Sequence, residues 1–350
     1  MALKYHLAAV MLTAFIVCSA CNKTGNSAAE SKDKPVSESS FQLGTLIDLA
    51  IYGGADNAIF KKAFDLISSF EQKLSRNIES SEVSEINRNA GKHAVKVSED
   101  TIFVIKRSLY YSNLSEGLFD VSVGPLVSLW GIGSENARLP ADDEIKTVLD
   151  LIDYKNIKID YEKNMVLLER EKMEIDLGAA AKGFIADKVL ELLRGNGVKS
   201  AIINLGGNVL LLGKKPDGSL FRIGIQNPFD LRGNYLGIFA GENISIVTSG
   251  VYERFFEESG KIYHHILNPE TGYPADNDIM GISVVTEKSI EGDCLSTALF
   301  MLGSKKALEF TENLEKTEAI IITKDKEIFL SSGIRSSFTL TDTSFQINQM

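Results

Sequence analysis

The chain of 350 residues contains few cysteines and few histidines. Its three cysteines are Cys18, Cys21 and Cys294, and only four residues are histidine. If Cys21 is acylated and Cys18 is removed with a leader, Cys294 is the only remaining thiol and no intrachain disulfide can form. The apolar neighbours of Cys294 favour a small buried residue over a reactive nucleophile.

A cluster of basic residues is also missing. The 37 lysines and arginines are scattered and are outnumbered by 47 aspartates and glutamates, which gives a formal net charge of -10. A nucleic-acid backbone is bound by clustered Lys and Arg side chains, so we expect no nucleic-acid partner. An acidic protein with an anionic substrate needs a metal ion or helix dipoles to hold that substrate.

The apolar run near the start of the chain is short. It covers residues 7–17, and the small residues Ser19 and Ala20 then lead into Cys21. A run of about 11 residues is too short to span a bilayer as a helix. A positive start, a short apolar segment and small residues before a cysteine are typical of a lipoprotein signal. We predict a signal peptide over residues 1–20 and a lipid anchor on Cys21; a cleaved secretory signal without lipid is the alternative.

The next segment, residues 21–40, is rich in Ser, Lys, Glu and Ala and has no apolar face. Such a segment cannot bury enough apolar surface to offset the entropy lost on ordering. We therefore expect a flexible tether over residues 21–40. It would hold a folded domain, residues 41–350, at the periplasmic face of the cell membrane.

Hydrophobic periodicity predicts a mixture of helices and strands in the folded domain. Apolar residues recur at helical spacing over residues 55–74, 101–114, 141–151, 181–195, 294–302 and 305–313. Strands are expected over residues 41–51, 166–168, 173–177, 201–204, 209–212, 221–226, 244–248, 281–285 and 319–323. Strand runs mixed with helices, without regular βαβ alternation, indicate an α+β fold rather than a doubly wound sheet.

Asp293 and Thr297 lie four residues apart near the start of a predicted helix. This spacing places both side chains on one helix face. A carboxylate and a hydroxyl are hard oxygen donors of the kind that Mg²⁺ prefers. The same spacing also fits capping, with Asp293 accepting backbone N–H bonds, and in isolation capping is the simpler interpretation.

The segment D-L-G-A-A-A-K-G, from Asp176 to Gly183, is a strand end, a tight passage of small residues and a helix start. A helix N-terminus behind small residues is a potential anion site. Lys182 in the first turn opposes the helix dipole, which favours an anionic partner. Small side chains also allow a backbone carbonyl, such as that of Ala179, to complete a metal site. A close-packed strand–helix junction explains the segment equally well.

Three further segments carry candidate site residues. The first is I-N-L-G-G-N at residues 203–208, where the Gly pair permits either a hairpin turn or a close ligand contact. In the second, V-T-S-G-V-Y-E-R-F, Ser249 ends a predicted strand. The third, Y-H-H-I-L-N-P-E-T-G-Y-P, contains His264 and His265, which face opposite sides if the segment is extended. Only one of the two histidines can then serve a site, and a satisfied core histidine is the alternative role.

Together and in this order, these motifs resemble those of the ApbE family of FAD:protein FMN transferases. The resemblance runs from about residue 41 to about residue 310, with Leu43 and Asn268 replacing the usual Met and Asp. Supporting motifs are L-G-T at residues 43–45, S-S-E-V-S-E-I-N ending at residue 87 and F-D-V-S-V-G-P-L at residues 119–126. The resemblance implies a bilobed α+β fold that binds FAD between its two lobes.

The resemblance also implies the roles of individual residues. Asp293, Thr297 and the carbonyl oxygen of Ala179 resemble the ligands of a Mg²⁺ ion. The resemblance implies contacts to FAD for Thr45, Trp130, Gly131, Asp176 and Lys182. It implies contacts near the pyrophosphate for Ser249 and His265.

The implied reaction is a Mg²⁺-dependent attack by a Thr or Ser hydroxyl of an acceptor protein on the FMN phosphorus of FAD, which releases AMP. His265 is the candidate base, because the unperturbed pKa of histidine is about 6.5, and Ser249 is a second candidate catalytic residue. The acceptor would be a redox-complex subunit at the membrane. Two alternatives are a Mg²⁺-dependent FAD pyrophosphatase that uses water, and a flavin-binding lipoprotein without turnover.

Overall fold

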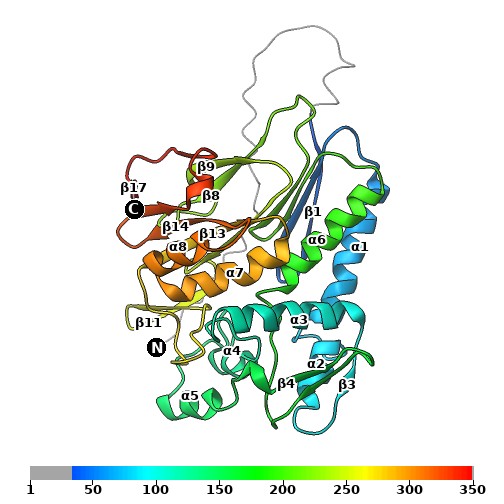
Figure 1. The fold of residues 1–350 in the computed structure, drawn as a ribbon, viewed down its shortest axis with the longest axis vertical. Coiled ribbons are helices and arrows are strands. Elements are labelled where there is room, and N and C mark those ends of the chain that lie inside the picture. The colour runs from blue at the N-terminus through cyan, green and yellow to red at the C-terminus, as the bar shows by residue number, and fades with distance from the viewer. Residues whose placement is uncertain (1–33, 349–350) are drawn as a thin grey trace.

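The computed structural model describes residues 34–348. The predicted signal peptide and lipid anchor at Cys21 lie outside the described residues, as does the tether up to residue 33. Within the described part, no helix combines the length and the apolar character that a membrane span requires. The elements form a mixed α+β fold with a large sheet, a helical layer and a second lobe (Figure 1).

A nine-stranded sheet organises the first lobe. All neighbouring strands are antiparallel except the last pair, β15 and β17. In sheet order the strands are β1 (Val36–Gln42), β2 (Thr45–Ile51), β6 (Ala201–Leu205), β7 (Asn208–Leu212), β10 (Ser245–Gly250), β13 (Ile279–Thr286), β14 (Glu318–Thr323), β15 (Glu327–Leu330) and β17 (Gln346–Asn348). The predicted α+β class is confirmed.

The start of the folded domain differs from the prediction. The tether was expected to reach residue 40, but β1 begins at Val36 and pairs with β2 throughout. Leu43 and Gly44 form a two-residue turn in which both φ angles are positive, as such hairpin turns require. β1 is an edge strand, so its main chain is satisfied by β2 while its polar side chains remain at the surface. The composition of residues 36–40 therefore resembles that of a flexible tether, although these residues form a strand.

Helices cover one face of the large sheet, and a small sheet covers the other (Figure 1). The side chains of β14 alternate between the two faces. Ile321 packs in the core beneath the helices, whereas Ile320 and Ile322 pack in a second core beneath the small sheet. The helical layer contains α1 (Asn57–Leu74), α6 (Ala181–Gly195), α7 (Ser289–Leu302) and α8 (Ser304–Glu312). The small sheet contains β8 (Phe221–Gln226), β9 (Tyr235–Gly241) and β16 (Phe338–Leu340). The short turn η2 (Ser332–Ile334) precedes β16 in the chain.

The second lobe lies below the helical layer in Figure 1. Its helices are α2 (Glu82–Arg88), α3 (Glu99–Leu114), α4 (Gly124–Trp130) and α5 (Asp142–Leu149), with the short turn η1 (Tyr154–Asn156). Its sheet has the order β3 (Val95–Lys96), β5 (Met165–Leu168) and β4 (Ile157–Asp160). A separate hairpin consists of β11 (Phe255–Glu258) and β12 (Lys261–His264).

The predicted strand over residues 173–177 was wrong. Residues 166–168 belong to β5, but residues 173–177 form no strand with them, because β5 already pairs with β3 and β4 on its two sides. The later segment instead bonds to other elements: the Ile175 N–H donates to Asn87 Oδ1 and the Asp176 N–H donates to the Val121 carbonyl. These bonds carry Asp176 to the junction between the lobes.

The N-terminal turns of α6 and α7 pack closely at Gly183. A Cβ atom at this position would lie 2.4 Å from the Ser289 carbonyl oxygen and 2.6 Å from the Ile290 Cα atom. Both contacts are with backbone, which cannot move aside without displacing α7. The glycine of the K-G pair is therefore required by the approach of two helix backbones.

We predict that Gly183→Ala destabilises the chain by about 2 kcal/mol, because overpacking against backbone outweighs the gain in helix propensity. Gly195→Ala is the matched control in the same helix, since a Cβ atom there meets no atom within 4 Å. The control should be neutral or stabilising by about 0.5–1 kcal/mol. Urea unfolding of both variants measures the difference, and equal stabilities would contradict the close contact.

Candidate active site

Asp293 lies where the N-terminal turns of α6 and α7 meet. Helix α7 begins at Ser289, earlier than the predicted residue 294, so Asp293 sits in the second turn and does not cap its own helix. Its Oδ2 atom instead accepts a hydrogen bond of 2.8 Å from the Gly183 N–H in the first turn of α6. Helix α6 has no side-chain cap of its own. The capping interpretation was therefore right in chemistry, but the capped helix is the neighbouring one.

Lys182 lies beside the second carboxylate oxygen. Its Nζ atom is 3.6 Å from Asp293 Oδ1 and donates to the Gly178 carbonyl at 3.2 Å. Each helix N-terminus contributes a partial positive charge of about half an elementary charge. Two helix starts and a lysine thus surround a single carboxylate. This arrangement is suited to an anion that also carries a metal ion.

The three predicted metal ligands come from adjacent segments. Thr297 is one turn after Asp293 on α7 and is half-buried, while Ala179 lies in the turn that leads into α6. A carboxylate, a hydroxyl and a backbone carbonyl are all hard oxygen donors, which fit Mg²⁺. Residues 34–348 contain no group of three or more His, Cys, Asp or Glu residues arranged to hold a metal. The proposed ligand set depends instead on one carboxylate and two neutral oxygens.

Asp176 is held by an arginine that the sequence did not single out. The Arg76 guanidinium lies 3.3 Å from Asp176 Oδ2 and also contacts Glu174. The other oxygen of Asp176 accepts the Gly178 N–H at 2.7 Å. Arg76 follows the end of α1 and bonds to the Gly124 carbonyl at the start of α4. Asp176 is therefore fixed at a junction of both lobes, and its predicted contact with FAD stays a prediction.

The two adjacent histidines have different environments. His264 is buried; its Nε2 atom lies 3.0 Å from the Ala275 carbonyl and its Nδ1 atom accepts the Ile266 N–H. Both ring nitrogens are thus satisfied, which gives His264 a structural role. His265 is half-buried, and its Nδ1 atom lies 3.2 Å from the Arg254 carbonyl. A carbonyl only accepts, so Nδ1 carries the proton and Nε2 has the free lone pair of a base.

The His265 ring carries no charge near neutral pH. Burial, together with the positive charge of Arg254, lowers the pKa of His265 to about 3, and Lys182 contributes to the same shift. The imidazole is therefore neutral at physiological pH.

Ser249 and Thr45 border this region from the large sheet. The Ser249 hydroxyl donates to Ser296 Oγ at 2.9 Å, and Ser296 donates to the Asp293 carbonyl at 3.0 Å. Ser249 is therefore linked to the α7 turn that carries Asp293. Thr45 packs against the Gly206 turn, where a Cβ atom would lie 2.3 Å from Thr45 Oγ1. Their catalytic and cofactor roles stay predictions.

Trp130 is fully buried. Its predicted contact with FAD stays a prediction. The indole packs against Tyr263 at a ring distance of 5.6 Å and donates to the Gly272 carbonyl at 2.8 Å. Gly131 ends α4 in the left-handed region, with φ of 59°. The Trp130 side chain thus ties the end of α4 to the segment around Gly272.

Two functional candidates were missed in addition to Arg76. Arg254 is exposed, and its side chain passes close to Gly133 and to the Gly44 turn. No ion pair of Arg254 is found within residues 34–348, so its charge is available to an anion. Asp187 on α6 accepts the N–H groups of Ser289 and Ile290. The only sequence feature that could have indicated Arg254 is its basic side chain shortly before the two adjacent histidines. No local sequence feature indicated Asp187.

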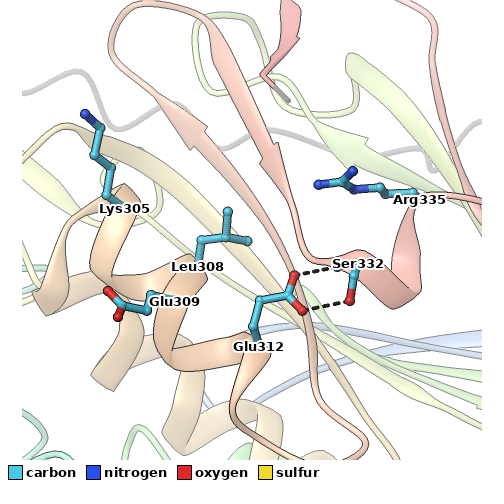
Figure 2. A pocket seen from close by; sticks show the side chains of 6 residues that line it. All are labelled: Lys305, Leu308, Glu309, Glu312, Ser332 and Arg335. Atoms are coloured by element: carbon cyan, nitrogen blue, oxygen red, sulfur yellow. Dashed lines mark hydrogen bonds between the residues drawn. The ribbon is translucent and has the colours of Figure 1, made fainter. Parts of the chain in front are cut away.

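Two hollows lie away from these residues. One, of about 460 Å³, lies between α8 and η2, where Glu312 accepts two hydrogen bonds from Ser332 (Figure 2). Its lining is Lys305, Leu308, Glu309, Glu312, Ser332 and Arg335. The other, of about 340 Å³, is mainly apolar and opens between α3, α7 and α8. Neither includes a predicted site residue.

The fold and the meeting of two helix starts define an α+β protein with a candidate metal and anion site. The chain belongs to the ApbE family, whose profile matches residues 43–321. The FAD:protein FMN transferase of Klebsiella pneumoniae (strain 342) is 38% identical over 317 residues, covering 91% of this chain and 98% of the relative. The FAD:protein FMN transferase of Treponema pallidum (strain Nichols) is 31% identical, covering 95% and 97%.

Solved structures agree with this assignment. The ApbE protein of Thermotoga maritima has a TM-score of 0.80 and 28% identity, covering 87% of this chain and 99% of the other. The flavin transferase ApbE of Vibrio cholerae has a TM-score of 0.78 and 27% identity, with the same coverage. The family resemblance stated from the sequence is confirmed, and so is the fold class.

The lowered pKa of His265 predicts how stability depends on pH. The unfolded chain, with an ordinary pKa of 6.5 at this residue, takes up a proton as pH falls from 6.5 towards 3, whereas the folded chain does not. The contribution of His265 to the free energy of unfolding is therefore present above pH 6.5 and is lost as the pH falls. His265→Gln should lose less stability than the unmodified chain between about pH 7 and about pH 5.

Urea unfolding at both pH values measures this difference. An NMR titration of the His265 ring gives an independent check, because its signals should not shift over the same interval. Parallel loss of stability in both proteins, together with a titrating His265 ring, would contradict the assigned protonation state.

Proposed function

We propose that this chain transfers FMN from FAD to a Thr or Ser hydroxyl of an acceptor protein and releases AMP, with Mg²⁺ bound by Asp293, Thr297 and the Ala179 carbonyl. The observation that carries the proposal is the meeting of two helix N-termini around Asp293 and Lys182. Family relatives named FAD:protein FMN transferase support it. The acceptor proposed is a membrane redox subunit, and the proposed location is the periplasmic face, through a lipid on Cys21.

Charge neutralisation is the main requirement of phosphoryl transfer. The N-terminal turn of α6 and the Lys182 ammonium supply positive charge for the FAD pyrophosphate, and Arg254 adds a second cation. When bound, Mg²⁺ would offset the charge that develops on the phosphate oxygens. Asp293 can hold the start of α6 and a metal ion at the same time. Its Oδ2 atom accepts the Gly183 N–H, and its Oδ1 atom, which faces Lys182, is the one proposed to bind the ion.

The transfer itself requires a proton acceptor beside the attacking hydroxyl. His265 is neutral, its Nδ1–H is held by the Arg254 carbonyl, and its Nε2 atom can take the hydroxyl proton. The hydroxyl oxygen forms a bond to the FMN phosphorus while the bond from that phosphorus to the bridging oxygen breaks. AMP leaves with the bridging oxygen. Ser249 supports the same turn of α7 through Ser296.

The proposal is tested by incubating the chain with FAD, MgCl₂ and an acceptor carrying a D-G-x-T-G-A-T segment. Equal amounts of AMP and covalently flavinylated acceptor are expected. AMP and FMN without labelled acceptor would instead support the FAD pyrophosphatase. FAD binding without either product would support a flavin-binding lipoprotein.

Asp293→Asn is expected to reduce transfer by about 10³-fold, because the metal loses its only carboxylate ligand. The amide oxygen can still accept the Gly183 N–H, so the free energy of unfolding should change by less than about 1 kcal/mol. The exposed helical residue Asp143 supplies the control variant Asp143→Asn. A normal transfer rate in Asp293→Asn at limiting Mg²⁺ would exclude the metal assignment.

His265→Ala should slow transfer by about 10²–10⁴-fold, the usual contribution of a general base. FAD affinity, followed by flavin fluorescence, should change far less, because the positive charge for the pyrophosphate comes from the start of α6, Lys182 and Arg254. His264→Ala offers a contrast in the adjacent position, since it should lower stability through the lost Ala275 and Ile266 contacts. An undiminished rate in folded His265→Ala would remove this residue as the base.

A further inference from the structure

The start of α7 is held by a residue of another helix. Lys288, which precedes α7, provides no side-chain cap. The N–H groups of Ser289 and Ile290 instead donate to the two carboxylate oxygens of Asp187 on α6, at 2.8 and 3.1 Å. Asp187 therefore satisfies two of the four N–H groups that a helix start leaves without a partner.

The same turn is also fastened to the central strands. The Ser289 hydroxyl donates to Asn208 Oδ1 on β7 and accepts from the Ser245 hydroxyl on β10 at 2.8 Å. All three polar side chains are buried. The I-N-L-G-G-N motif thus ends in a residue that contacts α7, and the helix start is held on two sides.

The two helices hold each other reciprocally. Asp187 on α6 binds the first turn of α7, and Asp293 on α7 binds the first turn of α6 through Gly183. Asp293 is one turn beyond the N–H groups that Asp187 fixes. A small shift or rotation of α7 would therefore move both Asp293 and Thr297 relative to Ala179.

We propose that Asp187 is a positioning residue, which sets the axial position of α7 and thereby the geometry of the Asp293, Thr297 and Ala179 oxygens toward a divalent cation. This inference rests on the proposed function of that site. Residues that orient metal ligands typically change metal affinity by about 10–100-fold when they are altered. Burial raises the pKa of Asp187 to about 6, so the chain keeps a carboxylate where its charge is disfavoured.

The test measures Mn²⁺ binding by electron paramagnetic resonance of the free ion, without FAD, in parallel with thermal unfolding. Asp187→Asn keeps the shape of the side chain, but its amide group cannot accept from both N–H groups. We expect its Mn²⁺ dissociation constant to rise about tenfold or more. Asp56→Asn is the matched control, because Asp56 caps α1 through the Ala58 N–H at 3.2 Å and is exposed. This control should bind Mn²⁺ normally.

Asp187→Glu keeps the charge and both acceptor oxygens but lengthens the side chain, which displaces the start of α7. It should also weaken Mn²⁺ binding, and it decides the question if Asp187→Asn does not fold. Normal Mn²⁺ affinity in a folded Asp187 variant would overturn the inference, even if flavin transfer by the unmodified chain is intact. Conversely, tight Mn²⁺ binding by an unmodified chain that transfers no flavin would contradict the proposed function alone.

Discussion

The candidate site depends on the contact between the N-terminal turns of α6 and α7. Two helix starts, each with a partial positive charge, would repel one another if nothing lay between them. Gly183 permits the approach of the backbones, and the carboxylates of Asp187 and Asp293 offset the charge by each accepting N–H groups from the opposite helix. The contact thus leaves one free carboxylate oxygen in a positive environment. A pyrophosphate with a divalent cation complements that environment.

The remaining candidate residues come from separate elements. His265 follows β12, Ser249 lies near the end of β10 and Asp176 belongs to a segment bonded to Asn87 and Val121. Arg254 joins two of these parts, because its carbonyl orients the His265 ring while its aliphatic side chain passes Gly133 and its guanidinium lies near Gly44. The positive charges proposed for the pyrophosphate and the candidate base are consequently held by different parts of the fold. A substrate that contacts both would lie between them.

Much of the candidate site could be predicted from the local sequence. The small residues before Lys182 and the i, i+4 pair Asp293 and Thr297 indicated their chemistry, because each pattern has a local physical meaning. Asp187 could not be found in this way, since its partner Ser289 lies 102 residues later and only the fold brings them together. The burial of Trp130 could not be predicted for the same reason, because the Gly272 carbonyl and Tyr263 that contact it come from a distant segment. β1 was missed because an edge strand needs no apolar pattern.

We propose that Asp293 and Thr297 place a divalent cation against the pyrophosphate of FAD. The most direct measurement is a crystal structure of the chain with FAD and Mn²⁺, with the ion located by its anomalous scattering. We expect a single strong peak within bonding distance of Asp293, Thr297 and the Ala179 carbonyl, touching a pyrophosphate oxygen. FAD bound with its pyrophosphate away from the start of α6, or an ion bound elsewhere, would contradict the account.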